Sequence, residues 1–211
     1  MATDGYFPHG FGMKSKGMGG AATAMTDNAF AGINNPAASA FAGNRIEAGM
    51  DVFMPRRGMN RTGSVFGLDA DVDSGSNSFL VPEFAYNTAI SDKIGVGISV
   101  YGNGGMNTNY PGGSITCQDP STGAMYPASV LCGPGGLGMD LMQLIIAPTV
   151  AYKVSDNHAF GVSPLLVYQQ FKAFGLQAFT PATSAPGALT NNGYDRSTGF
   201  GVRVGYMGKV S

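Results

Sequence analysis

Charged residues, cysteine and long apolar runs are scarce in this chain, and tryptophan is missing altogether. Only 12% of the 211 residues are charged, which is about half the share of an ordinary globular protein. With a net charge of −1, the chain lacks the positive charge that nucleic-acid binding requires. No run of about 18 apolar residues occurs, and this excludes a transmembrane helix.

Glycine is abundant instead, with 33 residues, and six stretches alternate apolar residues with small or polar ones. In residues 199–206, GFGVRVGY, the large apolar side chains occupy every second position. Successive side chains of a strand point to opposite faces, so each stretch predicts a strand with one apolar and one small or polar face. A soluble sandwich would cover its outer face with Lys, Glu and Thr. The pattern therefore predicts an all-β fold, a transmembrane antiparallel β-barrel of a Gram-negative outer membrane.

The connections between these stretches alternate in length. The predicted strands cover residues 45–55, 78–87, 93–101, 141–152, 159–171 and 199–206. Tight turns at 91–92 and 155–157 alternate with three long loops, at 57–77, 106–140 and 172–194. Short periplasmic turns and long external loops are typical of outer-membrane barrels. Each strand has about the 9 to 11 residues that a tilted strand needs to cross a bilayer.

Residues 1–44 differ from the rest, because they are rich in Ala, Gly, Met and Asn and show no alternation. We expect a short helix at 19–31, ended by the Asn34-Asn35-Pro36 sequence, since proline disfavours helix in the preceding residue. Small residues throughout predict a plug packed closely inside the barrel. The alternative is a flexible N-terminal arm. Residues 45–211 would then form the first part of the barrel, because six strands are too few to close around a plug.

The two cysteines, Cys117 and Cys132, both lie in the loop at 106–140. Free thiols and half of a metal site are possible readings, but the sequence has neither a CxxC motif nor a histidine nearby. A disulfide closing an exposed loop fits an oxidising compartment best. The sequence predicts no metal site and no cofactor.

Several short segments, taken in order along nearly the whole chain, resemble the FadL family of outer-membrane transporters of long-chain fatty acids and other hydrophobic compounds. They are residues 16–21 (KGMGGA) with Ala24, 34–37 (NNPA), 53–57 (FMPRR), 81–87 (VPEFAYN), 97–106 (GISVYGNGGM) and 201–209 (GVRVGYMGK). The resemblance implies a fourteen-stranded barrel with an N-terminal hatch that contains short helices. Its motif residues in the hatch would be Gly17, Gly19, Gly20, Asn35 and Pro36. The chain resembles only the first part of a family member, so eight strands would be missing.

The resemblance also implies a mechanism. External loops would capture a hydrophobic molecule, a pocket inside the barrel would bind it, and movement of the hatch with a kink in the third strand would release it sideways into the membrane. The substrate-binding or gating residues would be Tyr101, Gly102, Asn103, Gly104 and Gly105 at the kink, and Phe7, Phe11 and Met13 within the hatch residues 2–11 and just beyond. As alternatives, the glycines begin an external loop and the hatch residues serve ordinary packing.

Charges on the inward face need partners, because even a lumen is partly desolvated. Arg45, Glu47, Asp51, Glu83 and Arg203 are therefore candidates for ion pairs that tie the hatch to the wall. Arg56 and Arg57 would attract a substrate carboxylate, or else be solvated charges at a loop base. The expected partners are a hydrophobic small molecule (fatty acid or hydrocarbon), outer-membrane lipid and lipopolysaccharide, and no nucleic acid.

Two other function classes remain as alternatives, a surface adhesin that uses the long loops and a barrel lipid hydrolase. A hydrolase needs a nucleophile and a base. The two histidines are His9 in the plug and His158 beside a tight turn. Neither lies in a sequence setting that indicates a catalytic triad, so we predict that the protein is not an enzyme.

Overall fold

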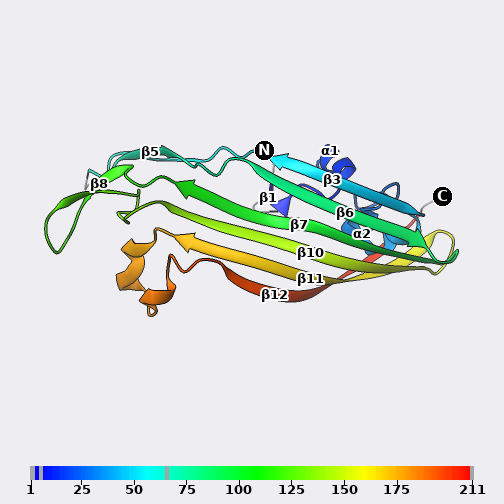
Figure 1. Cartoon of the computed structure of the whole chain (residues 1–211). Coiled ribbons are helices and arrows are strands. Elements are labelled where there is room, and N and C mark those ends of the chain that lie inside the picture. The colour runs from blue at the N-terminus through cyan, green and yellow to red at the C-terminus, as the bar shows by residue number, and fades with distance from the viewer. Residues whose placement is uncertain (1–2, 5–6, 65–66, 210–211) are drawn as a thin grey trace.

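The computed structural model describes residues 3–4, 7–64 and 67–209. Its centre is one six-stranded antiparallel sheet in which each strand pairs with the next long strand along the chain (Figure 1). The strands are β3 (Arg45–Phe53), β6 (Phe79–Ala89), β7 (Ile94–Tyr110), β10 (Leu137–Lys153), β11 (His158–Phe174) and β12 (Asp195–Gly208). The sheet is open in this chain, with β3 and β12 at its edges.

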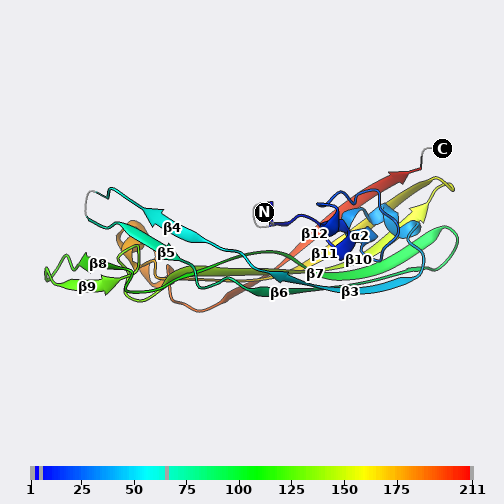
Figure 2. The same ribbon diagram turned by 90° about the horizontal axis from the view of Figure 1, so that it is seen from above.

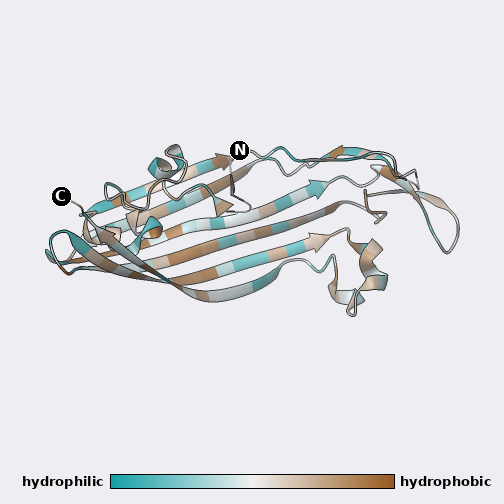
Figure 3. Cartoon of the chain, turned by 180° about the vertical axis from the view of Figure 1, so that it is seen from behind, coloured by the Kyte–Doolittle hydropathy of each residue, from teal (hydrophilic) through white to brown (hydrophobic). Residues whose placement is uncertain are grey.

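The two faces of the sheet are those that the alternation predicts. Along β12, Phe200 and Val204 are 70% and 76% exposed on one face, while Gly201 and Arg203 on the other are half-buried. Apolar and polar residues alternate along the strands (Figure 3). Because large aliphatic side chains are left uncovered over all six strands, this face suits contact with lipid rather than with water. No helix in the described part of the chain is long and apolar enough to span a membrane.

The described residues of the predicted hatch, residues 1–44, lie against the opposite face of the sheet (Figure 2). Its described elements are β1 (Thr3–Asp4), β2 (Phe7–Pro8), α1 (Met13–Gly17), α2 (Ala31–Asn34) and the 3₁₀ helix η1 (Pro36–Ala40). Residues 1–2 and 5–6, part of the predicted hatch, lie outside the described residues. The predicted helix at 19–31 is wrong, because Gly19 and Gly20 adopt positive φ angles of 64° and 89° that an α-helix cannot contain.

The hatch is held close to the sheet by η1, which packs on β10, β11 and β12. Three strand glycines leave the room that η1 and the preceding residue occupy, and we call Gly95, Gly161 and Gly205 the glycine patch. A Cβ atom on Gly161 would lie 2.3 Å from the carbonyl carbon of Pro36, and one on Gly95 would lie 2.3 Å from the Ser39 oxygen. The glycines of the inward face therefore allow the hatch backbone to approach the strands closely. This explains why glycine recurs on that face with a period of two.

Four of the strands are clearly longer than the sequence predicts. β7, β10 and β11 each have 17 residues and β12 has 14, because the hydrogen-bonded ladder continues after the outward side chains turn from apolar to polar. Asn107, Asp140 and Lys172 mark this change on neighbouring strands. The loops predicted at 106–140 and 172–194 are correspondingly shorter.

The external connections are folded rather than irregular, and they gather at one end of the sheet (Figure 1). They contain the hairpins β4 (Gly58–Arg61) with β5 (Ala70–Asp73) and β8 (Ile115–Gln118) with β9 (Met125–Ala128), and the 3₁₀ helices η2 (Gln177–Ala182) and η3 (Pro186–Ala188). A small apolar core joins the two hairpins, with Ala70, Ile115, Ala128 and Val130 buried in it. The sulfur atoms of Cys117 and Cys132 are bonded, with their Cα atoms 5.6 Å apart.

Candidate functional site

The sheet opens between β6 and β7. The last pair of their ladder among the described residues is Glu83 with Tyr101. Beyond it, β6 continues to Phe79 in register with β3, and β7 continues to Tyr110 in register with β10. The two strands therefore separate at this point, and each remains fixed by its other neighbour.

A β-bulge in β7 lies where the separation begins. Gly102 pairs with Leu144 and Gly104 with Gln143, so Asn103 is the extra residue. The Asn103 amide donates a hydrogen bond to the Gln143 side-chain oxygen at 3.1 Å. A bulge bends its strand and increases the local twist, which turns β7 away from β6. The glycines therefore lie inside β7. The predictions that they follow the end of the strand, or that they begin an external loop, are both wrong.

Glycine at position 102 fits close packing across the gap. A Cβ atom there would lie 2.9 Å from a methyl group of Val81. Real Cβ atoms essentially never approach so closely, so a larger residue must displace the Val81 side chain or shift one of the two strands.

A cavity of about 430 Å³ occupies the gap. From the inner side it is lined by Pro8 and Lys16 of the hatch and by Asp51, Phe53, Val81 and Gln143. Outward-facing side chains complete the lining, namely Leu80, Pro82, Met142, Leu144 and Tyr168. Because the β6–β7 ladder has ended at this level and the lining combines inward and outward residues of both strands, the cavity lies in a gap between the inner face and the lipid-facing side. Most of its surface is apolar, which suits a hydrophobic molecule.

A cluster of three charges borders this cavity, and we call Lys16, Asp51 and Glu83 the Lys16 cluster. The Lys16 ammonium donates to a Glu83 oxygen at 2.8 Å and also contacts a carboxylate oxygen of Asp51. The Glu83 side chain is only 3% exposed and the Lys16 side chain 17%. The predicted ion pairing of the hatch with the wall is therefore confirmed for Asp51 and Glu83. Two of the other inward charges behave differently, since Arg203 and Arg45 donate to the hatch carbonyl groups of Ile33 and Ala42.

Tyr101 supports the hatch beside the opening. It is fully buried, and its ring centroid lies 4.6 Å from that of Phe11. The Arg203 guanidinium of β12 donates to its hydroxyl oxygen at 3.4 Å. The pair of aromatic rings therefore links the hatch to β7 immediately before the bulge.

The structure brings together part of the predicted gating set. Gly102, Gly104, Gly105 and Arg57 line the cavity. The Arg57 guanidinium is engaged by the backbone oxygen of Asn107.

The other predicted residues lie elsewhere. Arg56 is exposed on the neighbouring loop. Phe7 and Met13 are exposed, and the hatch lines the cavity through Pro8 and Lys16 instead. The sequence analysis did not identify Lys16 as a site residue. The one indication of it was indirect, because the two inward carboxylates required a cation as partner.

The predicted hatch motif has an architectural role in the structure. The Asn35 amide donates to the Tyr206 backbone oxygen at 2.9 Å, and its side-chain oxygen accepts from Ala37 at 3.1 Å. Pro36 begins η1, which is a favoured place for proline. Gly20 is required because a Cβ atom there would lie 1.8 Å from the His9 oxygen. Gly17 ends α1, and Gly19 follows in a turn.

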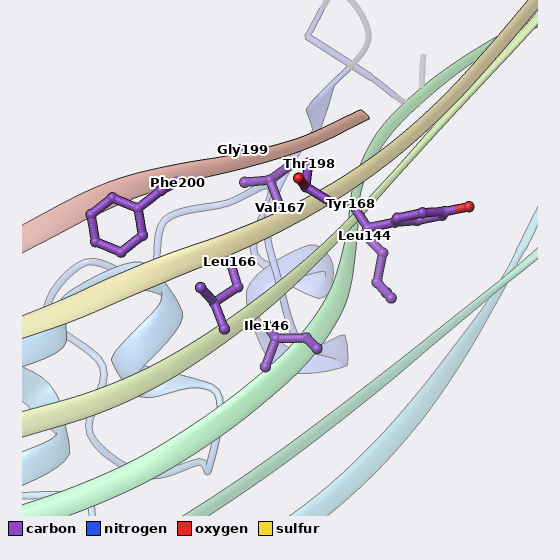
Figure 4. Close-up of a pocket in the computed structure, with 8 residues that line it drawn as sticks. All are labelled: Leu144, Ile146, Leu166, Val167, Tyr168, Thr198, Gly199 and Phe200. Carbon is purple, nitrogen blue, oxygen red and sulfur yellow. The ribbon is translucent and has the colours of Figure 1, made fainter. Parts of the chain in front are cut away.

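A second hollow, of about 470 Å³, lies over β10, β11 and β12. Figure 4 shows Leu144, Ile146, Leu166 and Phe200 as apolar side chains around it. These four are outward residues of their strands, so the hollow opens on the lipid-facing side, although its lining also includes the inward pair Val167 and Gly199.

The histidine that lies on the sheet is engaged in an interaction unrelated to a triad. The His158 ring nitrogen Nδ1 is 2.7 Å from the Tyr206 hydroxyl oxygen near the tight turn. Among the described residues, no group of three or more His, Cys, Asp or Glu side chains could hold a metal ion.

The chain resembles several solved structures at low sequence identity. It superposes on the P. putida toluene transporter TodX with a TM-score of 0.71 at 20% identity, covering 96% of this chain and 53% of that one. A TodX deltaS2S3 mutant monoaromatic hydrocarbon channel gives 0.70 at 21% identity, with 96% and 52% coverage. A Pseudomonas aeruginosa FadL homologue gives 0.54 at 16% identity, with 90% and 46% coverage. The chain thus spans about half the length of these structures, and they show its fold.

Family membership rests on the sequence itself. A search of curated protein sequences found no significant match. The profile of the family described as outer membrane protein transport protein (OMPP1/FadL/TodX) matches residues 10–207. This range includes most of the hatch and all but the last residue of the six long strands, so the chain belongs to the OMPP1/FadL/TodX family of outer-membrane transport proteins.

Proposed function

We propose that this chain forms the hatch and the first wall strands of a transporter that takes up hydrophobic compounds, long-chain fatty acids or other hydrophobic molecules, and releases them sideways into the outer membrane. External loops would capture the molecule, and the cavity would hold it. The observation that carries the proposal is the cavity at the end of the β6–β7 ladder, whose lining joins lumenal and lipid-facing side chains. A hydrophobic molecule that moves through it leaves one apolar environment for another without crossing water.

The charges at the cavity favour a neutral molecule over a carboxylate. Both cations of the lining are already engaged, Lys16 by two carboxylates and Arg57 by the Asn107 backbone oxygen. A bound carboxylate would have to displace a carboxylate from Lys16 or share the Arg57 guanidinium with the Asn107 oxygen, whereas an aromatic or aliphatic hydrocarbon needs neither. The similar TodX structures are titled as a toluene transporter and a monoaromatic hydrocarbon channel.

Uptake by cells that produce the full-length protein tests the route. In Gly102→Leu, the new side chain would fill the gap beside Val81, and uptake of labelled toluene should fall strongly. Gly199→Leu is the matched control, because the nearest atom to a Cβ there is 3.7 Å away and the position lies beside the second hollow. Labelled oleate in a parallel series separates the two substrate classes. Equal uptake by Gly102→Leu and the parent, with the barrel shown to be folded, would disprove the route between β6 and β7.

A further inference from the structure

Helix α1 is held at the opening almost entirely by polar contacts. Of its five residues, all described, Ser15 alone is buried. Met13, Lys14 and Gly17 are exposed, so the helix contributes little apolar surface to the contact with the wall. Stable docking of such a short helix normally depends on buried apolar area. The Lys16 cluster must therefore supply much of what keeps α1 in place.

The cluster connects α1 to the residue where the strands separate. Glu83 forms the last β6–β7 pair, and one of its oxygens accepts both from Lys16 at 2.8 Å and from the Gly12 backbone at 3.2 Å. Asp51 on β3 holds the same ammonium from the neighbouring strand. Three elements thus meet at one cation, namely α1, β3 and β6.

The charge balance makes this arrangement depend on Lys16. Two carboxylates and one ammonium leave the cluster one negative charge in excess. Without the ammonium, a carboxylate buried to 97% at Glu83 would face a second one from the adjacent strand. Unpaired buried charges are strongly unfavourable, and they are relieved by hydration or by movement of the surrounding structure.

We propose that Lys16 is the residue that keeps the hatch closed over the gap between β6 and β7, and that breaking its contacts with Asp51 and Glu83 lets α1 move away and water enter. The rest of the hatch stays docked, because η1 lies in the glycine patch on other strands. The inference rests on the proposed function only where it gives the movement a role in transport. The movement of α1 itself can be measured without transport.

The accessibility of position 15 reports the movement. The Ser15 side chain of α1 is fully buried, with its oxygen against Gly10, so a cysteine there is shielded while α1 keeps its packed position. The native cysteines are bonded to each other and do not react. In purified full-length protein carrying Ser15→Cys, Lys16→Gln should speed labelling by a water-soluble maleimide by at least about tenfold, as expected for loss of a buried ion pair.

Lys14→Gln is the matched control. Lys14 lies on the same helix and pairs with Asp27 at 3.0 Å, but both side chains are more than half exposed, so the labelling rate should stay within about twofold. Lys16→Arg should retain slow labelling. If Lys16→Gln does not fold, Lys16→Met combined with Asp51→Asn and Glu83→Gln removes the unpaired charges and should still label quickly. Slow labelling in every folded variant that lacks Lys16 would overturn the proposal.

A second measurement separates this inference from the proposed route. Lys16→Gln should raise the ion conductance of the full-length protein in planar bilayers, whereas Lys14→Gln should not. Faster labelling with normal toluene uptake by Gly102→Leu would leave the role of Lys16 standing and remove the lateral route. Loss of uptake by Gly102→Leu with unchanged labelling in Lys16→Gln would support the lateral route and remove the role of Lys16.

Discussion

Replacement of Ile98 by lysine should destabilise the folded protein in a membrane, because this side chain lies at the middle of the lipid-facing band. On β10 the outward apolar side chains run from Met142 to Tyr152, with the polar Asp140 beyond them. Ten residue steps of about 3.3 Å make about 33 Å of strand. At a tilt of about 40° this spans about 25 Å of bilayer, the height of a typical apolar band. Ile98 pairs with Pro148, close to the midpoint.

The expected cost follows from depth. A lysine on the lipid face costs about 2 to 4 kcal/mol at the bilayer midplane and about 0 to 1 near the interfaces. Ile98 is 39% exposed on the outward face, so the substituted ammonium can find no lumenal partner without reversing the strand. The folding equilibrium constant should therefore fall by about 30- to 900-fold. Ile94, which pairs with Tyr152 at the end of the band, is the matched position, and lysine there should cost less than about 1 kcal/mol.

The measurement is reversible urea unfolding of the full-length protein in lipid vesicles, followed by circular dichroism or by the gel mobility of the folded form. Ile98→Ala serves to subtract the loss of the isoleucine side chain. Equal costs for Ile94→Lys and Ile98→Lys, or a cost below about 0.5 kcal/mol at both, would refute the assignment of this face to lipid.

Two further predictions concern the external loops and the hatch. Replacing both Cys117 and Cys132 by alanine opens a loop with a sequence separation of 15, and this should cost about 3 kcal/mol of stability in the chain-entropy model. Limited proteolysis of intact cells should then cut this loop faster. Unchanged cleavage would show that the apolar core of the hairpins is enough to hold the loop. Gly161→Ala would place a Cβ atom 2.3 Å from the carbonyl carbon of Pro36, so it should displace η1 and lower the unfolding midpoint, whereas Gly199→Ala should not; equal midpoints would contradict close docking in the glycine patch.

Much of the barrel wall could be predicted from the sequence because strand periodicity is local information. Each alternating stretch assigns its own faces, and a tight turn such as that between Ala89 and Ile94 dictates which strands are neighbours. The family segments added the hatch and the location of the kink at Gly102. The inward carboxylates Asp51 and Glu83 also indicated ion pairs with the hatch, without identifying the cation.

Other features depend on contacts between distant parts of the chain. Glu83 and Lys16 are 67 residues apart, and no local pattern states which cation reaches which carboxylate. The bulge at Asn103 depends on one extra residue relative to β10, which only the paired strand reveals.

The alternating sequence by itself determined that this chain forms antiparallel strands with one face for lipid, since side-chain direction in a strand depends only on position along the chain. Tertiary structure alone decided where the wall opens and what closes it. The ladder between β6 and β7 ends at Glu83 and Tyr101, and α1 is held there because its own cation, Lys16, pairs with carboxylates from distant strands. Such contacts are settled by the packing of whole elements against one another, which sequence periodicity does not encode.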